Sequence, residues 1–288
     1  PDVQQRRGLY PPPPGATDLP GLDAAGTVVA AGKGVDPAYL GRELCALANG
    51  GAYAEYCTVP YQQTMPYPEG YDAARAAALP EVMCTAWSNV VWLGRLQEGE
   101  TLLVQGGTSG VGMAAIQIAR RLFDARVIAT ASSADKRQTC LSLGALAAVD
   151  YHDDDWVGQV REAAGENGVD VILDAQAGAY VNQHLNLLDF DGRLIQIASH
   201  KGQMSQVDTR MLVRRRLTLA GSTLRPRDAT YKGRLAETLV RKVWPSLAAG
   251  EIDIRICATF AFEDVRRAHE MLDANKQIGK VVLRGAGF

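Results

Sequence analysis

The stretch Thr101-Leu-Leu-Val-Gln-Gly-Gly-Thr-Ser-Gly-Val-Gly-Met113 sets the organisation of this chain. Residues 101–105 have the pattern of a short buried strand, and residues 113–120 begin a helix. The glycines between them let the backbone approach a pyrophosphate, which the N–H groups and dipole of a helix N-terminus attract. With more strand–helix units following, the turn predicts dinucleotide binding. The cofactor-binding residues expected there are Thr108, Ser109, Gly110 and Val111.

Two glycine fingerprints overlap on this turn. Gly106-x-x-x-Gly110-x-Gly112 has the spacing of short-chain dehydrogenases, whereas Gly107-x-Ser109-x-x-Gly112 fits G-x-G-x-x-G with serine at the middle glycine. Short-chain enzymes carry the turn near the N-terminus and use a Tyr-x-x-x-Lys pair. Here no tyrosine has a lysine four residues later, and about a hundred residues precede the turn. We therefore exclude the short-chain class.

Composition sets further limits on function. The 288 residues are 47% hydrophobic and 22% charged, as in a soluble chain of two domains. A net charge of -2 gives no electrostatic case for binding nucleic acid or an anionic membrane. No apolar run is long enough to span a bilayer, and no signal peptide is recognised. The five cysteines are scattered, which predicts free thiols in a reducing, cytoplasmic compartment.

The first part of the chain predicts a small, mostly β domain over residues 1–78. Short segments separated by glycines suggest strands at 21–32, 44–47 and 52–59. Two helices are expected next, at 72–79 and 81–93, divided at Pro80.

From residue 79 to residue 230 the pattern alternates between strands and helices. Such alternation predicts an α/β fold with a doubly wound parallel sheet. The expected strands are 101–105, 126–131, 147–149, 169–175, 192–198 and 217–222. Residues 231–288 leave this alternation with a helix at 232–247, a strand at 254–260, a helix at 263–274 and a strand at 280–283. We expect this third segment to return to the first domain.

Several segments together resemble one family. They are Gly21-Leu-Asp-x-Ala-Gly26, Gly51-Ala-Tyr-Ala-Glu-Tyr56, Leu79-Pro-Glu-x-x-x-Thr-Ala-Trp87, the glycine turn and Ala274-Asn-Lys-x-x-Gly-Lys-Val-Val282. The chain resembles the NADPH:quinone oxidoreductases, the zeta-crystallin-like branch of the zinc-free medium-chain dehydrogenase/reductase superfamily. The resemblance implies a GroES-like catalytic domain built from both chain ends around a Rossmann domain. Family members carry roughly forty residues before the position matching Pro1, so we expect a truncated chain or a numbered start that is not the natural one.

The end of the second predicted sheet strand bears on cofactor choice. NAD-preferring sites place Asp or Glu about 20 residues past the turn, where it binds the ribose 2′-hydroxyl. Here Thr130-Ala-Ser-Ser133 is followed by no carboxylate until Asp135, and Lys136 lies in the first turn of the next helix. The family match assigns Ser132, Lys136 and Tyr151 to a 2′-phosphate, so we expect NADPH. The alternative is a helix N-cap beside a solvated lysine.

Other polar residues follow the expected strands, at the edge where such sheets bind ligands. They are Asp174, Ser199, His200 and Ser222. Asp174, Ser199 and Ser222 could equally be turn or cap residues. Thr85 resembles the family threonine near the nicotinamide.

Metal catalysis is not expected. Zinc-dependent relatives have a His-Glu pair where this chain has Leu22-Asp23, and leucine cannot bind zinc. The four histidines have no mutual ligand spacing, and His269 is interpreted as structural.

The implied reaction is hydride transfer to a quinone or other electron-poor alkene or enone. Tyr10 matches a substrate-side family tyrosine, whose hydroxyl could bond a developing oxyanion. Its alternative is stacking on Pro11–Pro14. Two other functions stay open: a nucleotide-binding protein of the same fold with little turnover and a structural or RNA-binding role, and a related enoyl reductase. The apolar strand at 217–222 predicts a homodimer joined along the sheet edge.

Overall fold

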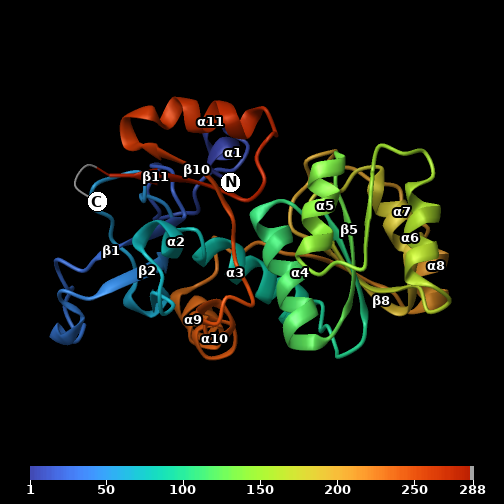
Figure 1. The fold of residues 1–288 in the computed structure, drawn as a ribbon, viewed down its shortest axis with the longest axis horizontal. Helices are drawn as coiled ribbons and strands as arrows, with labels where there is room; N and C mark the ends of the chain where they lie inside the picture. Colours follow the sequence, from blue (N-terminus) through green and yellow to red (C-terminus); the bar gives the residue numbers. More distant parts are fainter. Residues whose placement is uncertain (286–288) are drawn as a thin grey trace. The chain divides into compact units, whose positions relative to one another are not determined.

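The computed structural model describes residues 1–285 and divides into two compact units. One unit combines residues 1–84 with the chain from Leu224 onward, and the other comprises residues 85–223. In Figure 1 the first unit therefore contains both the blue and the red ends of the chain. The C-terminal segment belongs to the same unit as the N-terminal residues.

The first unit contains two small sheets. Strands β1 (Asp23–Thr27), β2 (Glu43–Leu47) and β3 (Thr64–Pro66) form an antiparallel sheet in that order. Strands β10 (Ile256–Ala261) and β11 (Lys280–Arg284) form a parallel pair. The helices of this unit are α1 (Asp2–Arg6), η1 (Pro37–Tyr39), η2 (Tyr61–Gln63), α2 (Ala73–Ala77), α3 (Pro80–Ala86, which crosses the division), α9 (Ala229–Lys242), α10 (Trp244–Ala248), η4 (Phe262–Asp264) and α11 (Val265–Asp273).

The expected strand at 52–59 is wrong. Those residues are irregular, and the third strand of the sheet is β3 instead. The backbone at the start of the segment bonds to a loop, because Gly51 N–H donates to the carbonyl of Leu19 and Tyr53 N–H to that of Pro20. Gly50 and Gly51 both have positive φ, which an extended strand does not accommodate.

The long helix expected at 232–247 is two helices. Helix α9 ends at Lys242 and α10 begins at Trp244, with Val243 between them at φ -110°. Pro245 explains the interruption, since proline lacks an N–H and its ring clashes with the carbonyl four residues earlier.

The second unit contains a six-stranded parallel sheet in the order β6-β5-β4-β7-β8-β9, which confirms the predicted fold class. Its strands are β4 (Thr101–Gln105), β5 (Arg126–Thr130), β6 (Ala147–Val149), β7 (Val169–Asp174), β8 (Leu188–Gln196) and β9 (Thr218–Gly221). Its helices are η3 (Trp87–Leu93), α4 (Gly110–Phe123), α5 (Ala134–Ser142), α6 (Trp156–Ala164), α7 (Tyr180–Leu187) and α8 (Thr209–Arg215). The strand order reverses between β4 and β7.

The core of this unit follows from continuous apolar strands. Leu103, Ile128, Ile172 and Leu194 are each fully buried, as expected for a parallel sheet covered by helices. Helices α6 and α7 pack on these strands and on each other. Burial of these apolar side chains stabilises the sheet, and the carboxyl ends of its strands position the candidate site.

The single helix expected at 81–93 is an α-helix followed by a π-helical turn. Helix α3 ends at Ala86, and η3 continues from Trp87 with wider hydrogen bonds, including Gly94 N–H to Asn89 O at 2.8 Å. The Asn89 side chain donates to Thr85 O at 2.8 Å, a carbonyl that a regular α-helix would use for its own ladder. This competition accounts for the widened turn.

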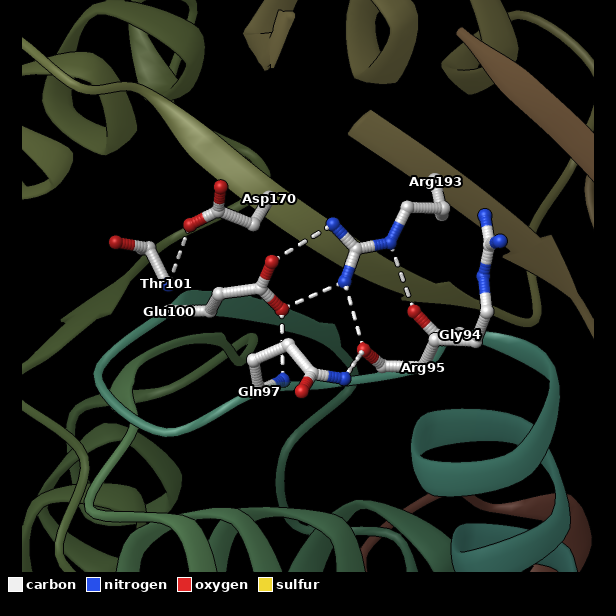
Figure 2. A network of polar contacts seen from close by, with 7 residues as sticks. All are labelled: Gly94, Arg95, Gln97, Glu100, Thr101, Asp170 and Arg193. Atoms are coloured by element: carbon white, nitrogen blue, oxygen red, sulfur yellow. Dashed lines mark hydrogen bonds and ion pairs between the residues drawn. The ribbon is translucent and has the colours of Figure 1, made fainter. Parts of the chain in front are cut away.

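A buried ion pair fastens the segment after η3 to the sheet (Figure 2). Arg193 of β8 donates to both carboxylate oxygens of Glu100, at 2.9 and 2.6 Å. The same guanidinium donates to Gly94 O at 2.8 Å and Arg95 O at 3.2 Å. Gln97 N–H donates to the Glu100 carboxylate from the loop. The network lies just before the start of β4, at the end of the strand opposite the glycine turn.

Candidate functional site

The candidate cofactor residues of the second unit follow the carboxyl ends of its parallel strands. The glycine turn follows β4, Ser132 follows β5, Tyr151 follows β6, Ser199 follows β8, and Ser222 follows β9. Because the strands are parallel, these ends share one edge of the sheet. The order reverses at β4 and β7, and ligands of open α/β sheets bind at such a point.

The glycine turn has the close packing expected of a nucleotide cradle. A Cβ atom at Gly112 would lie 2.4 Å from Gly106 O, so only glycine lets helix α4 start this near the turn. Gly106 has φ +87°. Ser109 caps the helix, accepting from Gly112 N–H at 3.0 Å and donating to Gly106 O at 2.9 Å. The turn therefore fits a pyrophosphate at a helix N-terminus.

The residues expected near a 2′-phosphate lie after β5 and β6. The cap of helix α5 is Ser133, whose hydroxyl accepts from Lys136 N–H at 3.3 Å. The half-buried Ser132 is thus not the capping residue. Lys136 is only 9% exposed, and burial lowers its pKa. A solvated lysine, the alternative interpretation, does not describe this side chain.

A carboxylate near these residues is engaged elsewhere. Asp150, at the end of β6, accepts from Arg137 at 2.6 Å and from His152 N–H at 3.0 Å. These contacts, led by the His152 N–H, lower the pKa of Asp150. The sequence interpretation overlooked this carboxylate. Because Asp150 is paired with Arg137, we do not assign it the role of the acid that binds the ribose 2′-hydroxyl in NAD-preferring sites.

Asp174 is part of the core. It is fully buried and accepts from the N–H groups of Gln176 at 2.7 Å and Ala177 at 3.0 Å. His184 Nδ1 lies 3.5 Å from its carboxylate. Burial raises the pKa of Asp174, but the His184 contact and the two N–H donors outweigh it and leave the pKa lowered. These two backbone contacts are those of a loop-capping residue.

The remaining candidates of this unit differ in exposure. Ser199 and His200 are exposed, Ser222 is half-buried, and Thr85 is buried. Partial burial lowers the pKa of His200. The Thr85 carbonyl accepts from Asn89.

Tyr10 belongs to the first unit. It is half-buried, and the Arg225 guanidinium carbon lies 5.4 Å from its ring centroid. Tyr10, Glu81, Arg225 and Lys232 line the same small cavity. Sequence reasoning missed the last three, because a lysine or arginine beside an amphipathic helix has no local sign of burial.

His269 and Asp23 are both held by polar contacts within the first unit. His269 is buried, bonding Tyr53 Oη through Nε2 at 3.1 Å and Arg6 through Nδ1 at 3.2 Å, in agreement with a structural role. Asp23 pairs with Lys280 at 2.7 Å and accepts from Glu81 N–H.

Within residues 1–285, no group of three His, Cys, Asp or Glu side chains is placed to hold a metal ion. Over the same residues, no helix has the length and apolar character needed to cross a membrane.

Comparison with known proteins places this geometry among dehydrogenases. Residues 1–69 match the model of the alcohol dehydrogenase GroES-like domain, and residues 110–241 match that of the zinc-binding dehydrogenases. The human synaptic vesicle membrane protein VAT-1 homolog is 30% identical, with 98% of this chain and 75% of that protein covered.

Solved structures agree with this match. The quinone oxidoreductase of Thermus thermophilus, also solved as its NADPH complex, is 30% identical with a TM-score of 0.81, covering 98% of this chain and 86% of that one. An NAD-dependent alcohol dehydrogenase is 29% identical with a TM-score of 0.82, covering 98% and 87%. Fold and ligand edge define an oxidoreductase that binds a nicotinamide dinucleotide. The chain belongs to the medium-chain dehydrogenase/reductase superfamily.

Proposed function

We propose that the chain is an NADPH-dependent reductase that transfers hydride to a quinone or another electron-poor alkene or enone. The observation that carries the cofactor preference is the buried Lys136 in the first turn after β5, where the nearby Asp150 is paired with Arg137. A buried cation at this position favours a 2′-phosphate over a bare ribose. Likeness to a quinone oxidoreductase of the same superfamily supports the substrate class.

Each residue has a defined task in this proposal. NADPH, when bound, supplies the hydride. Ser109, Gly110 and Val111 bind the pyrophosphate, the last two through their N–H groups at the helix N-terminus, and Ser132, Lys136 and Tyr151 bind the 2′-phosphate. Ser199, Ser222, Thr108 and Thr85 complete the cofactor contacts. The Tyr10 hydroxyl donates a hydrogen bond to the oxygen that gains negative charge when the alkene is reduced.

A substrate panel tests the reaction. NADPH oxidation is followed at fixed ionic strength with benzoquinone, naphthoquinone, a simple enone and a saturated ketone. We expect turnover with the first three and none with the ketone. Hydride added to the alkene carbon of a quinone or enone gives an enolate whose charge is delocalised onto oxygen, whereas a saturated ketone has no such alkene and takes hydride only at its carbonyl carbon. Turnover of the ketone alone would contradict the proposal.

A second candidate is a dinucleotide-binding protein with little turnover. The relative named as a synaptic vesicle membrane protein, a name that states no reaction, favours it. Tight NADPH binding without oxidation of the cofactor by any member of the panel would support this candidate. An enoyl reductase would instead prefer a thioester-conjugated alkene, which the same assay can include.

We propose that the protein lies in the reducing cytoplasm, because its cysteines are all free: Cys45, Cys57, Cys84, Cys140 and Cys257.

We also propose a homodimer joined along β9. β9 is an edge strand, and Leu219 is 38% exposed on it. Ser222 N–H donates to Gln196 O of β8 at 2.9 Å. Backbone N–H groups of successive strand residues point alternately to the two neighbouring strands. Because the Ser222 N–H points to β8, the N–H of Leu219, three residues earlier, points to the open edge. Leu219→Pro is expected to give a monomer by light scattering, because it removes only an outward donor.

Leu219→Thr is the control for this variant. It retains the N–H and introduces a β-branched side chain that suits a strand, so the dimer should persist. Thr218→Pro, in contrast, removes a donor on the side of β8 and should destabilise the unit. A Leu219→Pro protein that stays dimeric at micromolar concentration, or a wild-type monomer, would contradict the proposed interface.

A further inference from the structure

A small cavity in the first unit contains two buried cations. Arg225 is 4% exposed and Lys232 is 1% exposed, and both line the cavity together with Tyr10. Leu22 and Leu47 give it apolar walls, and Glu81 lies at its side. The cavity volume is about 20 Å³, which is room for about one water molecule or one carboxylate oxygen.

The partners of the two cations are neutral. Lys232 Nζ donates to Asn49 Oδ1 at 2.5 Å and to Arg225 O at 2.8 Å. Arg225 donates through Nε to Asn49 O at 3.0 Å and through Nη1 to Gln5 Oε1 at 2.9 Å. Within residues 1–285 neither side chain pairs with a carboxylate, and Arg225 Nη2 is buried with no hydrogen-bond partner. Lys232 has three donor hydrogens and uses two.

The Glu81 carboxylate has a positive neighbour of its own. Burial lowers the pKa of Lys280, but Asp23 and then Glu81 outweigh it and leave the pKa raised. Glu81 therefore acts on Lys280 while it also lines the cavity, and within residues 1–285 no ion pair joins Arg225 or Lys232 to a carboxylate. Buried charges are costly unless an opposite charge compensates them.

The protonation of Lys232 reflects this imbalance. Burial, with a smaller contribution from the Arg225 charge, lowers its pKa to about 8, against raising effects from Cys84 and Asp228. A bound anion would favour the charged ammonium and raise this pKa.

We propose that the cavity binds the carboxylate of the substrate, so that the preferred electron-poor alkenes are small enone carboxylates. The inference rests on the proposed function through Tyr10, the expected substrate-side residue, which lines the same cavity. Lys232 and Arg225 supply the positive charge, and Leu22 and Leu47 supply the apolar walls.

Direct binding tests the proposal without turnover. The probe is 4-oxopentanoate, with its methyl ester as the neutral comparison, titrated into the full chain by calorimetry. We expect the acid to bind and the ester to bind at least tenfold more weakly. Lys232→Met should weaken acid binding about tenfold or more by removing one charge-assisted hydrogen bond. Lys242→Met, at an exposed lysine of the same helix α9, should leave it unchanged.

The pH dependence distinguishes charge pairing from a structural lysine. Below pH about 8 Lys232 is protonated in the free protein, and acid binding should be strongest there. As pH rises through about 8 the ammonium loses its proton and affinity should fall. Near that pH the bound anion raises the pKa, so binding should take up protons, measured as a heat that depends on the buffer. Lys232→Met should abolish this uptake.

Kinetics then connects the cavity to turnover. With 4-oxopent-2-enoate and its methyl ester as substrates, wild type should have a KM at least tenfold lower for the acid, and Lys232→Met should erase that preference. If neither substrate is reduced, the proposed function fails while 4-oxopentanoate binding still decides the inference. Equal binding of acid and ester to wild type, or a preference unaffected by Lys232→Met, would overturn it. If the variant does not fold, the wild-type binding and its pH dependence give the decision.

Discussion

Lys136→Glu is expected to weaken NADPH binding far more than NADH binding. The two cofactors differ only by the 2′-phosphate, so the ratio of their affinities isolates the contact with that group. One charge-assisted hydrogen bond to a charged group contributes about 1.5–3 kcal/mol, so Lys136→Ala should cost about tenfold to a hundredfold in NADPH affinity. Glutamate adds repulsion to the loss. Because Lys136 is 9% exposed, water screens the contact less than at an open surface.

The measurement is calorimetric titration of both cofactors at fixed ionic strength. Arg161→Glu is the matched control, since it makes the same change of charge at an exposed position on helix α6 of the same unit. Ser132→Asp should act in the same direction as Lys136→Glu, by placing a carboxylate beside the phosphate and offering NADH a ribose partner. Equal wild-type affinity for NADH and NADPH, or a ratio that Lys136→Glu does not change, would show that the phosphate binds elsewhere.

Arg193→Met is expected to destabilise the second unit without changing its dinucleotide affinity. The guanidinium makes four hydrogen bonds and is buried. Its loss removes the positive charge beside Glu100 and the donor to Gly94 O, and it leaves the Glu100 carboxylate and the Arg95 carbonyl only their bonds from Gln97. Breaking such a pair costs about 3–5 kcal/mol. The lower end applies because Glu100 is partly exposed. For a unit of this size the melting temperature should fall by on the order of 10 °C.

An exposed pair of the same chemistry is the control. Arg216 donates to both Asp191 oxygens, at 2.7 and 2.6 Å, but both side chains are largely exposed. Arg216→Met should therefore change the melting temperature little. Adding Glu100→Met to Arg193→Met should recover stability relative to the single variant, because no buried carboxylate is then left unpaired. A fall in dinucleotide affinity of the folded Arg193→Met protein would refute a purely structural role.

The sequence by itself determined the sheet and its ligand edge. Strong local signals specify them: continuous apolar runs in β4, β5 and β7, a helix after each strand, and glycines at 106–112. Helices and strands impose their own periods on the sequence, and a glycine with a 2.4 Å neighbour tolerates no other residue. These features follow from short stretches of chain, so one stretch is enough to recognise them.

Contacts between distant residues were decided only by the tertiary structure. The segment 52–59 alternates like a strand, but the loop at residues 19–22 takes its first backbone hydrogen bonds. Arg193 and Glu100 are 93 residues apart in the chain and meet only when β8 packs beside β7. Lys232 lies on an amphipathic helix like any surface lysine until Asn49 and Arg225 enclose it. Burial and charge compensation are properties of the packed molecule, because they depend on which segments remove water from a side chain.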